Sequence, residues 1–180
     1  LPGSAATYLC LGPGWSTTCN TPFRRHKTWV HEGGIATPLI VHWPAGIEDR
    51  GAVRHNVGHV VDLVPTLLDL ADAKSAVGEN GGPTPPGKSL AAAFQKDQSV
   101  THDSIWWLHE GNRAIRIGDW KLVAAGKGGS WELFDLSSDR AETKNLALKH
   151  PEKVRKLEAA WTKQYDAFRE QAAKDEKRKK

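Results

Sequence analysis

This 180-residue sequence contains no methionine, and Leu1 stands where a start residue would be. Because a translated reading frame begins with Met, we expect the chain to be a processed form or a part of a longer protein. Long apolar runs are absent too: no window approaches the roughly 18 consecutive apolar residues of a membrane span, so we expect no membrane segment. With 39% hydrophobic and 26% charged residues, the composition is typical of a globular protein.

Cysteine is scarce, and neither Cys10 nor Cys19 belongs to a metal-binding pattern. His55 and His59 lie four residues apart, but no third ligand accompanies them, so we predict no metal site within this chain. The two cysteines are compatible with a disulfide in an exported protein and equally with two unpaired thiols. The sequence leaves both alternatives open.

An excess of basic residues gives the chain a net charge of +4, but most of it lies at one end. The last seven residues, 174–180, carry five positive and two negative charges, which leaves a net charge of +1 for the remainder. Such a tail is typical of a solvated terminus. We therefore predict no nucleic-acid partner, and retain binding of an anionic polysaccharide as an alternative function.

One stretch matches the phosphate-binding pattern GxxxxGK[ST] at residues 82–89 (GPTPPGKS). That motif works through backbone N–H groups that surround a phosphate. Three of the four variable positions here are proline, which has no N–H. We predict a proline-stiffened linker and no nucleotide site.

The spacing of apolar residues predicts secondary structure in four parts of the chain. Residues 37–43 (TPLIVHW) are a short apolar run that predicts a buried strand. Residues 62–71 (DLVPTLLDLA) predict a helix with Pro65 in its first turn. Four strand-like runs over residues 104–136, separated by glycine-containing turns, predict an antiparallel meander. From about Pro151, apolar steps of three and four predict an amphipathic helix. Its expected apolar face consists of Val154, Leu157, Trp161, Tyr165 and Phe168.

Several segments, taken in order, carry a resemblance to a known family. Lys27 is followed by an aromatic-containing spacer, Glu32-Gly33-Gly34, and a segment that ends in Trp43-Pro44. Together they are similar to the type I sulfatases, the arylsulfatase family of the alkaline-phosphatase-like superfamily. The other matching segments are residues 59–71 (HVVDLVPTLLDLA), 87–90 (GKSL), 111–123 (GNRAIRIGDWKLV) and 131–147 (WELFDLSSDRAETKNLA).

The resemblance implies hydrolysis of sulfate esters by a formylglycine nucleophile, with calcium to neutralise the sulfate. The family's nucleophile motif, Cys or Ser followed by x-Pro-x-Arg, is missing, because neither Cys10 nor Cys19 has that context. The acidic metal-binding pairs are missing too. We therefore expect the C-terminal part of a sulfatase, with formylglycine and calcium held by residues upstream of this chain. On its own the chain is expected to be inactive.

The expected fold class is α/β, as the C-terminal portion of the alkaline-phosphatase-like fold, plus a small α+β subdomain. We predict that residues 1–88 end the large α/β domain. Residues 89–173 form the subdomain, an antiparallel sheet with a C-terminal helix, and residues 174–180 are a basic tail.

Three residues are candidates for the site. Lys27 resembles the family's sulfate-binding lysine, where an ammonium would stabilise charge that grows as the S–O bond breaks. His109 and Asn112 flank a tight turn in the predicted meander and are expected to contact substrate. For Glu32 we expect a structural role, in which it holds the Lys27 loop by accepting backbone hydrogen bonds. For Gly33 and Gly34 we expect either unusual φ/ψ values or close backbone approach.

The resemblance implies a sulfate-ester small molecule or a sulfated carbohydrate as the partner, and a periplasmic or secreted location. Within the superfamily, the alternative activity is that of a phosphatase or phosphodiesterase. The intact enzyme would distinguish the two by its relative rates on aryl sulfates and aryl phosphates.

Overall fold

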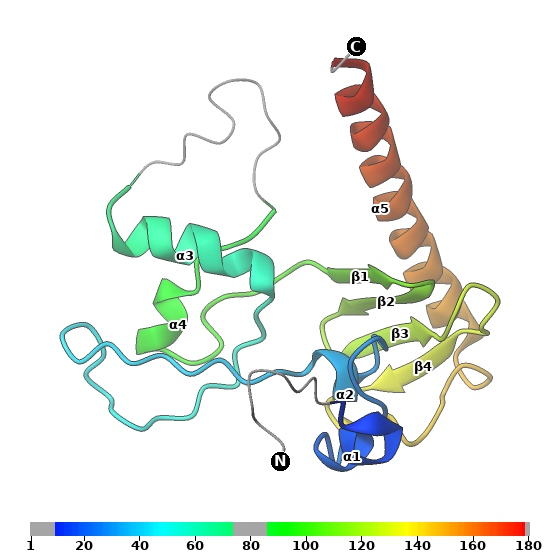
Figure 1. Ribbon diagram of the computed structural model, residues 1–180, viewed down its shortest axis with the longest axis horizontal. Helices are drawn as coiled ribbons and strands as arrows, with labels where there is room; N and C mark the ends of the chain where they lie inside the picture. Colours follow the sequence, from blue (N-terminus) through cyan, green and yellow to red (C-terminus); the bar gives the residue numbers. More distant parts are fainter. Residues whose placement is uncertain (1–9, 74–85, 179–180) are drawn as a thin grey trace. The chain divides into compact units, whose positions relative to one another are not determined.

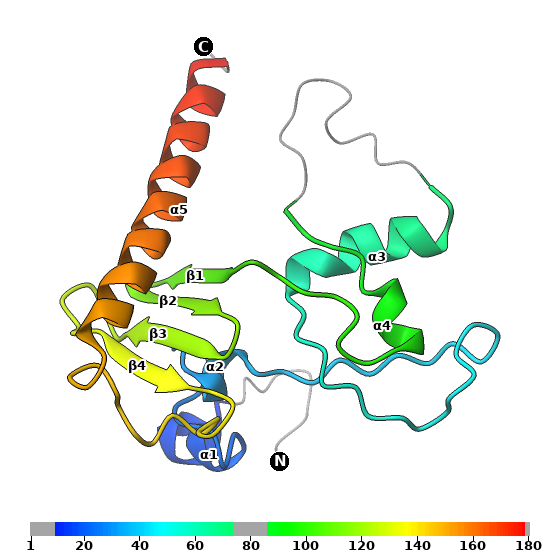
Figure 2. The same ribbon diagram turned by 180° about the vertical axis from the view of Figure 1, so that it is seen from behind.

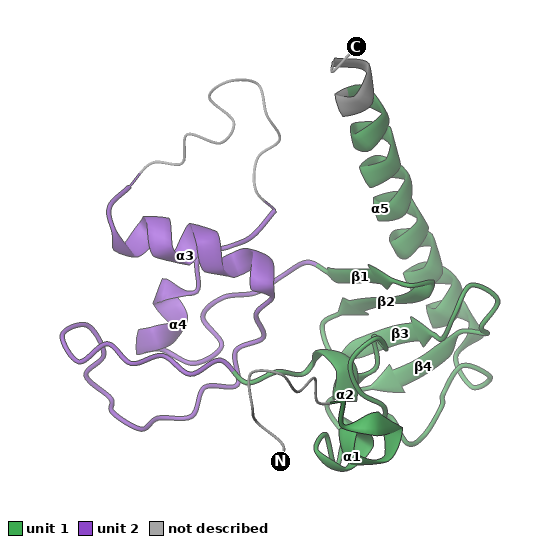
Figure 3. Ribbon diagram, viewed as in Figure 1, with its two compact units in different colours: residues 1–38, 104–180 green, residues 39–103 purple. Residues whose placement is uncertain are grey.

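The computed structural model describes residues 10–73 and 86–178, with side chains to residue 174. The chain divides into two compact units, shown in Figure 3. Unit 1 combines residues 1–38 with residues 104–180, and unit 2 comprises residues 39–103. Segments far apart in the sequence therefore belong to one unit.

Unit 1 is built on the predicted antiparallel meander (Figure 1). Its four strands are β1 (Ile105–His109), β2 (Asn112–Ile117), β3 (Trp120–Ala124) and β4 (Glu132–Asp135), in the spatial order β1-β2-β3-β4. The turn between β1 and β2 consists of Glu110 and Gly111, both with positive φ (49° and 80°). This conformation suits a two-residue hairpin, and it brings His109 opposite Asn112.

The predicted amphipathic helix, α5 (Pro151–Arg178), covers one face of the sheet (Figures 1 and 2). Leu157 and Trp161 pack there against Ile115, Leu122 and Leu133, which point to this face from the three later strands. The indole of Trp161 also donates to the backbone carbonyl of Trp107 (3.2 Å). The periodicity of this helix thus correctly predicted four residues of its packed face, Val154, Leu157, Trp161 and Tyr165, whereas the fifth, Phe168, is 50% exposed.

The opposite face is covered by a segment from the N-terminal part of the chain. Val30 packs against Ala114, Val123 and Phe134, and just beyond it the short helix α2 (Glu32–Ile35) contributes Ile35. Because both faces are covered, the central strands are buried on both sides. Through this contact, residues up to 38 belong to unit 1. The division into domains at residue 88, which concerns the intact protein, stays a prediction.

The strand predicted over residues 37–43 is wrong. In the structure this stretch has no regular secondary structure, and the side chain of Ile40 is 91% exposed. Among the described residues, the only sheet is the one formed by β1 to β4. An extended segment becomes a strand only where a neighbour satisfies its backbone N–H and C=O groups, and apolar composition cannot supply that neighbour.

Unit 2 contains the predicted helix as η1 (Val60–Asp62) followed by α3 (Leu63–Leu70), and then α4 (Ala91–Gln95). Asp62 is fully buried and accepts hydrogen bonds from the backbone N–H groups of His59 (2.7 Å) and Lys88 (2.8 Å). The segment that matches the phosphate-binding pattern ends at Lys88 and Ser89, and the N–H of Lys88, which a phosphate site would use, is engaged by the carboxylate of Asp62. Its residues 82–85 lie outside the described part of the chain.

Candidate functional site

Lys27 lies at the tip of a compact loop, residues 24–34, which is closed by its own backbone hydrogen bonds. The N–H of Gly33 donates to the carbonyl of Arg24 (2.9 Å), and the N–H of Gly34 donates to that of His31 (2.8 Å). A Cβ atom on Gly33 would collide with the carbonyls of Arg24 and Arg25, and one on Gly34 with the carbonyl of Trp29. Of the two reasons expected for the Gly-Gly pair, close backbone approach is therefore the one that applies, since neither glycine has a positive φ.

The backbone around Lys27 is strained. Arg25 and Thr28 both have positive φ values, 67° and 93°. For a β-branched residue such as Thr28 this conformation is a genuine outlier, and such a residue costs about 1–3 kcal/mol. Strain of this size persists only where surrounding contacts hold the chain in place.

Asn112 provides one of these contacts. Its side-chain amide donates from Nδ2 to the carbonyl oxygen of Thr28 (3.1 Å), and its Oδ1 accepts from the backbone N–H of Gly126 (2.9 Å). The residue is only 3% exposed. Asn112 therefore links the Lys27 loop to β2 and to the chain that follows β3.

A buried ionic cluster fixes the other end of the loop. The ammonium of Lys121 on β3 lies 2.8 Å from a carboxylate oxygen of both Glu32 and Glu142. The second oxygen of Glu142 accepts the backbone N–H of Glu32 (2.9 Å), and Arg140 lies 3.3 Å from Glu32. Lys121 and Glu142 are fully buried. Glu32 thus has the expected structural role, but its carboxylate pairs with the side chains of Lys121 and Arg140, where backbone donors were expected.

The two carboxylates of this cluster differ in pKa. Burial raises the pKa of Glu142 above its ordinary value, and Lys121 offsets only part of this effect. Burial also acts to raise the pKa of Glu32, but Lys121 and Arg140 together bring it below its ordinary value. Glu32, which begins α2, is therefore the carboxylate that firmly keeps its charge.

His31, at the start of α2, is a buried and neutral histidine. Its side chain is fully buried, and its Nε2 lies 3.0 Å from a carboxylate oxygen of Glu132. Burial lowers its pKa from 6.5 to about 4, although the contact with Glu132 opposes the change. The imidazole is thus uncharged near pH 7 and serves to connect α2 with β4.

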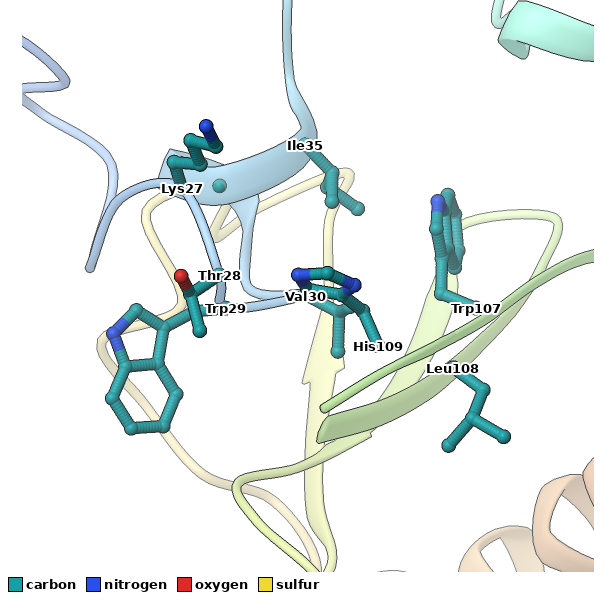
Figure 4. Close-up of a pocket in the computed structure, with 9 residues that line it drawn as sticks. Lys27, Thr28, Trp29, Val30, Ile35, Trp107, Leu108 and His109 are labelled. Atoms are coloured by element: carbon teal, nitrogen blue, oxygen red, sulfur yellow. The ribbon is translucent and has the colours of Figure 1, made fainter. Parts of the chain in front are cut away.

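A pocket of about 220 Å³ opens between the Lys27 loop and β1 (Figure 4). The imidazole of His109 stands between the loop and Trp107 in this view. Lys27 and His109 are both exposed, and the side chain of His109 is 57% accessible. The pocket is lined by Lys27, Thr28, Trp29, Val30, Gly34, Ile35, Trp107, Leu108 and His109.

The structure thus brings two of the three predicted site residues, Lys27 and His109, to one pocket. Asn112 is not among the lining residues, because its amide is engaged beneath the loop. Sequence reasoning missed Lys121, because alternation in β3 places it on the face opposite Trp120 and Leu122, and no local signal indicates that this second face is buried as well. The roles of the three predicted residues in substrate binding stay predictions.

Metal and thiol chemistry have no assembled centre in the part of the chain that is described. Across residues 10–73 and 86–178, no three His, Cys, Asp or Glu side chains gather as a cation site would require. Cys10 and Cys19 are free and exposed. The described residues therefore do not fit calcium or a formylglycine centre. None of the helices in the same ranges has the length and apolar character to cross a membrane.

Comparison with known proteins assigns the class. The sequence model of the family described as N-sulphoglucosamine sulphohydrolase, C-terminal, matches residues 24–171. The chain therefore belongs to this sulfatase family and corresponds to its C-terminal part. The match includes the Lys27 loop, the sheet and most of α5.

Individual relatives agree with this assignment. The chain is 32% identical to an uncharacterized sulfatase of Schizosaccharomyces pombe, over 88% of this chain and 30% of the relative. It is 30% identical to human arylsulfatase K (71% and 25%) and 28% identical to mouse N-acetylgalactosamine-6-sulfatase (71% and 24%). The chain thus spans less than a third of the length of these relatives.

A solved structure extends the agreement to the fold. The crystal structure of Ps i-CgsB matches with a TM-score of 0.67 and 26% identity, over 80% of this chain and 32% of that one. The expected fold class, an α/β sulfatase portion with a small α+β subdomain, is confirmed by this likeness and by the antiparallel sheet with its C-terminal helix.

Proposed function

We propose that this chain is the C-terminal portion of an enzyme that hydrolyses sulfate esters, with sulfated carbohydrates as its substrate class. The observation that carries the proposal is Lys27, a solvent-accessible cation at the edge of a pocket, on a strained loop that buried contacts hold in place. Membership of the sulfatase family supports the reaction type. The mouse relative, an N-acetylgalactosamine-6-sulfatase, supports a sugar sulfate.

In this proposal Lys27 binds the sulfate group. Its ammonium attracts the anion and stabilises the negative charge that grows on the bridging oxygen as the S–O bond breaks. Because the ammonium of Lys27 is already held in place by the loop, it does not have to reorient during the reaction. Preorganised groups accelerate such steps in this way. The contacts around the loop supply the required rigidity.

His109 contacts the remainder of the substrate. The walls of the pocket are mostly apolar, with Trp107 and Ile35 beside the imidazole. Aromatic walls with a few polar groups suit a sugar ring, whose apolar face packs on a side chain while its hydroxyls form hydrogen bonds. His109 is one of the polar groups here that can accept or donate such a bond.

Formylglycine and calcium, which the family resemblance implies, are proposed to be held by parts of the enzyme outside this chain. Within the chain, Lys27 and His109 bind and orient the ester, and the chain alone is expected to leave sulfate esters intact. Incubation of the isolated chain with an aryl sulfate tests this point, since release of sulfate would contradict it.

The proposal is tested by Lys27→Ala in the full-length enzyme. We expect kcat/KM for a sulfate ester to fall by about 10², as is typical when one charge-stabilising group is removed. Lys156→Ala, which removes an exposed lysine of α5, is the matched control and should leave the kinetics unchanged. Near-normal kinetics in Lys27→Ala would contradict the role of this lysine.

The reaction type needs a separate measurement. The full-length enzyme is expected to cleave an aryl sulfate far faster than the corresponding aryl phosphate. The reverse preference would instead indicate a phosphatase or phosphodiesterase of the same superfamily.

A further inference from the structure

We propose that Asn112 is a positioning residue, which acts on the reaction by holding Thr28 and thereby Lys27 in place. This inference rests on the function proposed for Lys27. It assigns Asn112 a role that differs from the substrate contact predicted from the sequence. Three features support it: the strain next to Lys27, the hydrogen bonds at both ends of the Asn112 amide, and the place of Asn112 in the sheet.

The first feature is the strained backbone. Thr28 follows Lys27 directly and has a φ of 93°, which a β-branched residue adopts only when its surroundings impose it. The amide of Asn112 donates to the carbonyl oxygen of this same residue (3.1 Å). Removal of that donor leaves the Thr28 carbonyl without this partner and allows the peptide to relax. Relaxation at Thr28 would reorient the preceding residue, Lys27.

The second feature is that both ends of the amide are used within the protein. While Nδ2 binds Thr28, Oδ1 accepts the N–H of Gly126 (2.9 Å), so the orientation of the side chain is defined. Asn112 is 3% exposed and does not line the pocket. Because it is buried and lies outside the pocket lining, the Asn112 side chain contacts the loop and not the space available to the substrate.

The third feature is the place of Asn112 at the start of β2. There it pairs with His109 across the hairpin of β1 and β2. One residue is therefore joined to both sides of the pocket, to His109 through the strand pairing and to Lys27 through Thr28. Such a link sets the separation between the two groups proposed to contact the substrate.

The test uses Asn112→Asp in the full-length enzyme. An aspartate keeps the acceptor for Gly126 but loses the donor to Thr28, so we expect kcat/KM to fall at least tenfold through kcat, as misplacement of a catalytic group does. Asn145→Asp is the matched control, because the side-chain oxygen of Asn145 accepts from Leu133 (3.0 Å) and Ala147 (2.9 Å) and an aspartate preserves both bonds. It should retain full activity.

Asn112→Ala separates the loss of the donor from the added charge, and it should give a similar decrease. Thr28→Gly in the Asn112→Ala background should restore part of the activity, because glycine adopts positive φ without strain. In a Lys27→Ala background the effect of Asn112→Asp should shrink to less than twofold, since the group it positions is gone. Circular dichroism checks that each variant folds. If Asn112→Ala does not fold, the kinetics of Asn112→Asp still test the proposal.

Two results would overturn the inference. One is near-normal kcat/KM in Asn112→Asp while Lys27→Ala is strongly impaired. The other is a loss that stays the same with Lys27→Ala or Thr28→Gly, which would indicate direct substrate contact by Asn112. If Lys27→Ala itself is normal, the proposed function of Lys27 fails, and the kinetics distinguish this case from the other two.

Discussion

At the scale of single residues, His31 makes the stability of unit 1 dependent on pH. Burial lowers its pKa from 6.5 to about 4. Between pH 6.5 and 4, His31 is therefore protonated in the unfolded state but not in the folded state. As the pH falls from 6.5 to 4, the unfolded state gains protons and the free energy of unfolding decreases, by about 3 kcal/mol for this group alone. Glu32, with its lowered pKa, acts in the same direction at still lower pH.

We therefore predict that His31→Gln reduces this loss of stability between pH 6.5 and 4. Glutamine can donate to Glu132 but does not titrate. Urea unfolding at several pH values measures the effect. Tryptophan fluorescence reports on unit 1, which contains every tryptophan except Trp43. The control is His42→Gln, an exposed histidine of unit 2. An unchanged pH dependence in His31→Gln would contradict this explanation.

At the scale of elements, the ionic cluster joins α2 to β3. Lys121→Met would leave Glu32 and Glu142 buried without their shared cation, and we predict a loss of about 3–5 kcal/mol in the free energy of unfolding. Arg140→Ala removes a half-exposed cation from the same Glu32 and should cost no more than about 1 kcal/mol. Urea denaturation compares the two variants. Equal losses in the free energy of unfolding would show that burial does not determine how much each cation contributes to stability.

The elements also show what the sequence can predict. The meander and α5 follow from local signals, namely glycine-containing turns and apolar steps of three and four, so both were predicted correctly. The packing of Val30 on the sheet has no local signal, because its partners Ala114 and Val123 are more than 80 residues away. Lys27 and His109, both candidates from the sequence, line one pocket, and their roles stay predictions, whereas the importance of Lys121 became visible only through its buried contacts. Residues 37–43 failed as a strand for the same reason, since strand pairing is a long-range property.

At the scale of the whole molecule, the two units differ in how well they bury their apolar residues. Unit 1 has a sheet covered on both faces, whereas α3 in unit 2 exposes Leu63, Val64 and Leu67. Leu67 is 66% exposed, and Val60 just before the helix is 70% exposed. A contiguous apolar face of this kind is typical of a surface that another protein part covers, or of one that promotes association.

We predict that the isolated 180-residue chain self-associates through this apolar face of α3. Leu67→Lys places a charge in its middle and should shift the chain toward the monomer, because burying an unpaired ammonium in an apolar contact is unfavourable. Leu148→Lys is the matched control: Leu148 is fully exposed but belongs to unit 1, so the same substitution there should leave association unchanged. Sedimentation velocity over a range of concentrations measures the outcome. A chain that is monomeric throughout would contradict the prediction, and equal effects of both substitutions would assign association to net charge instead of to α3.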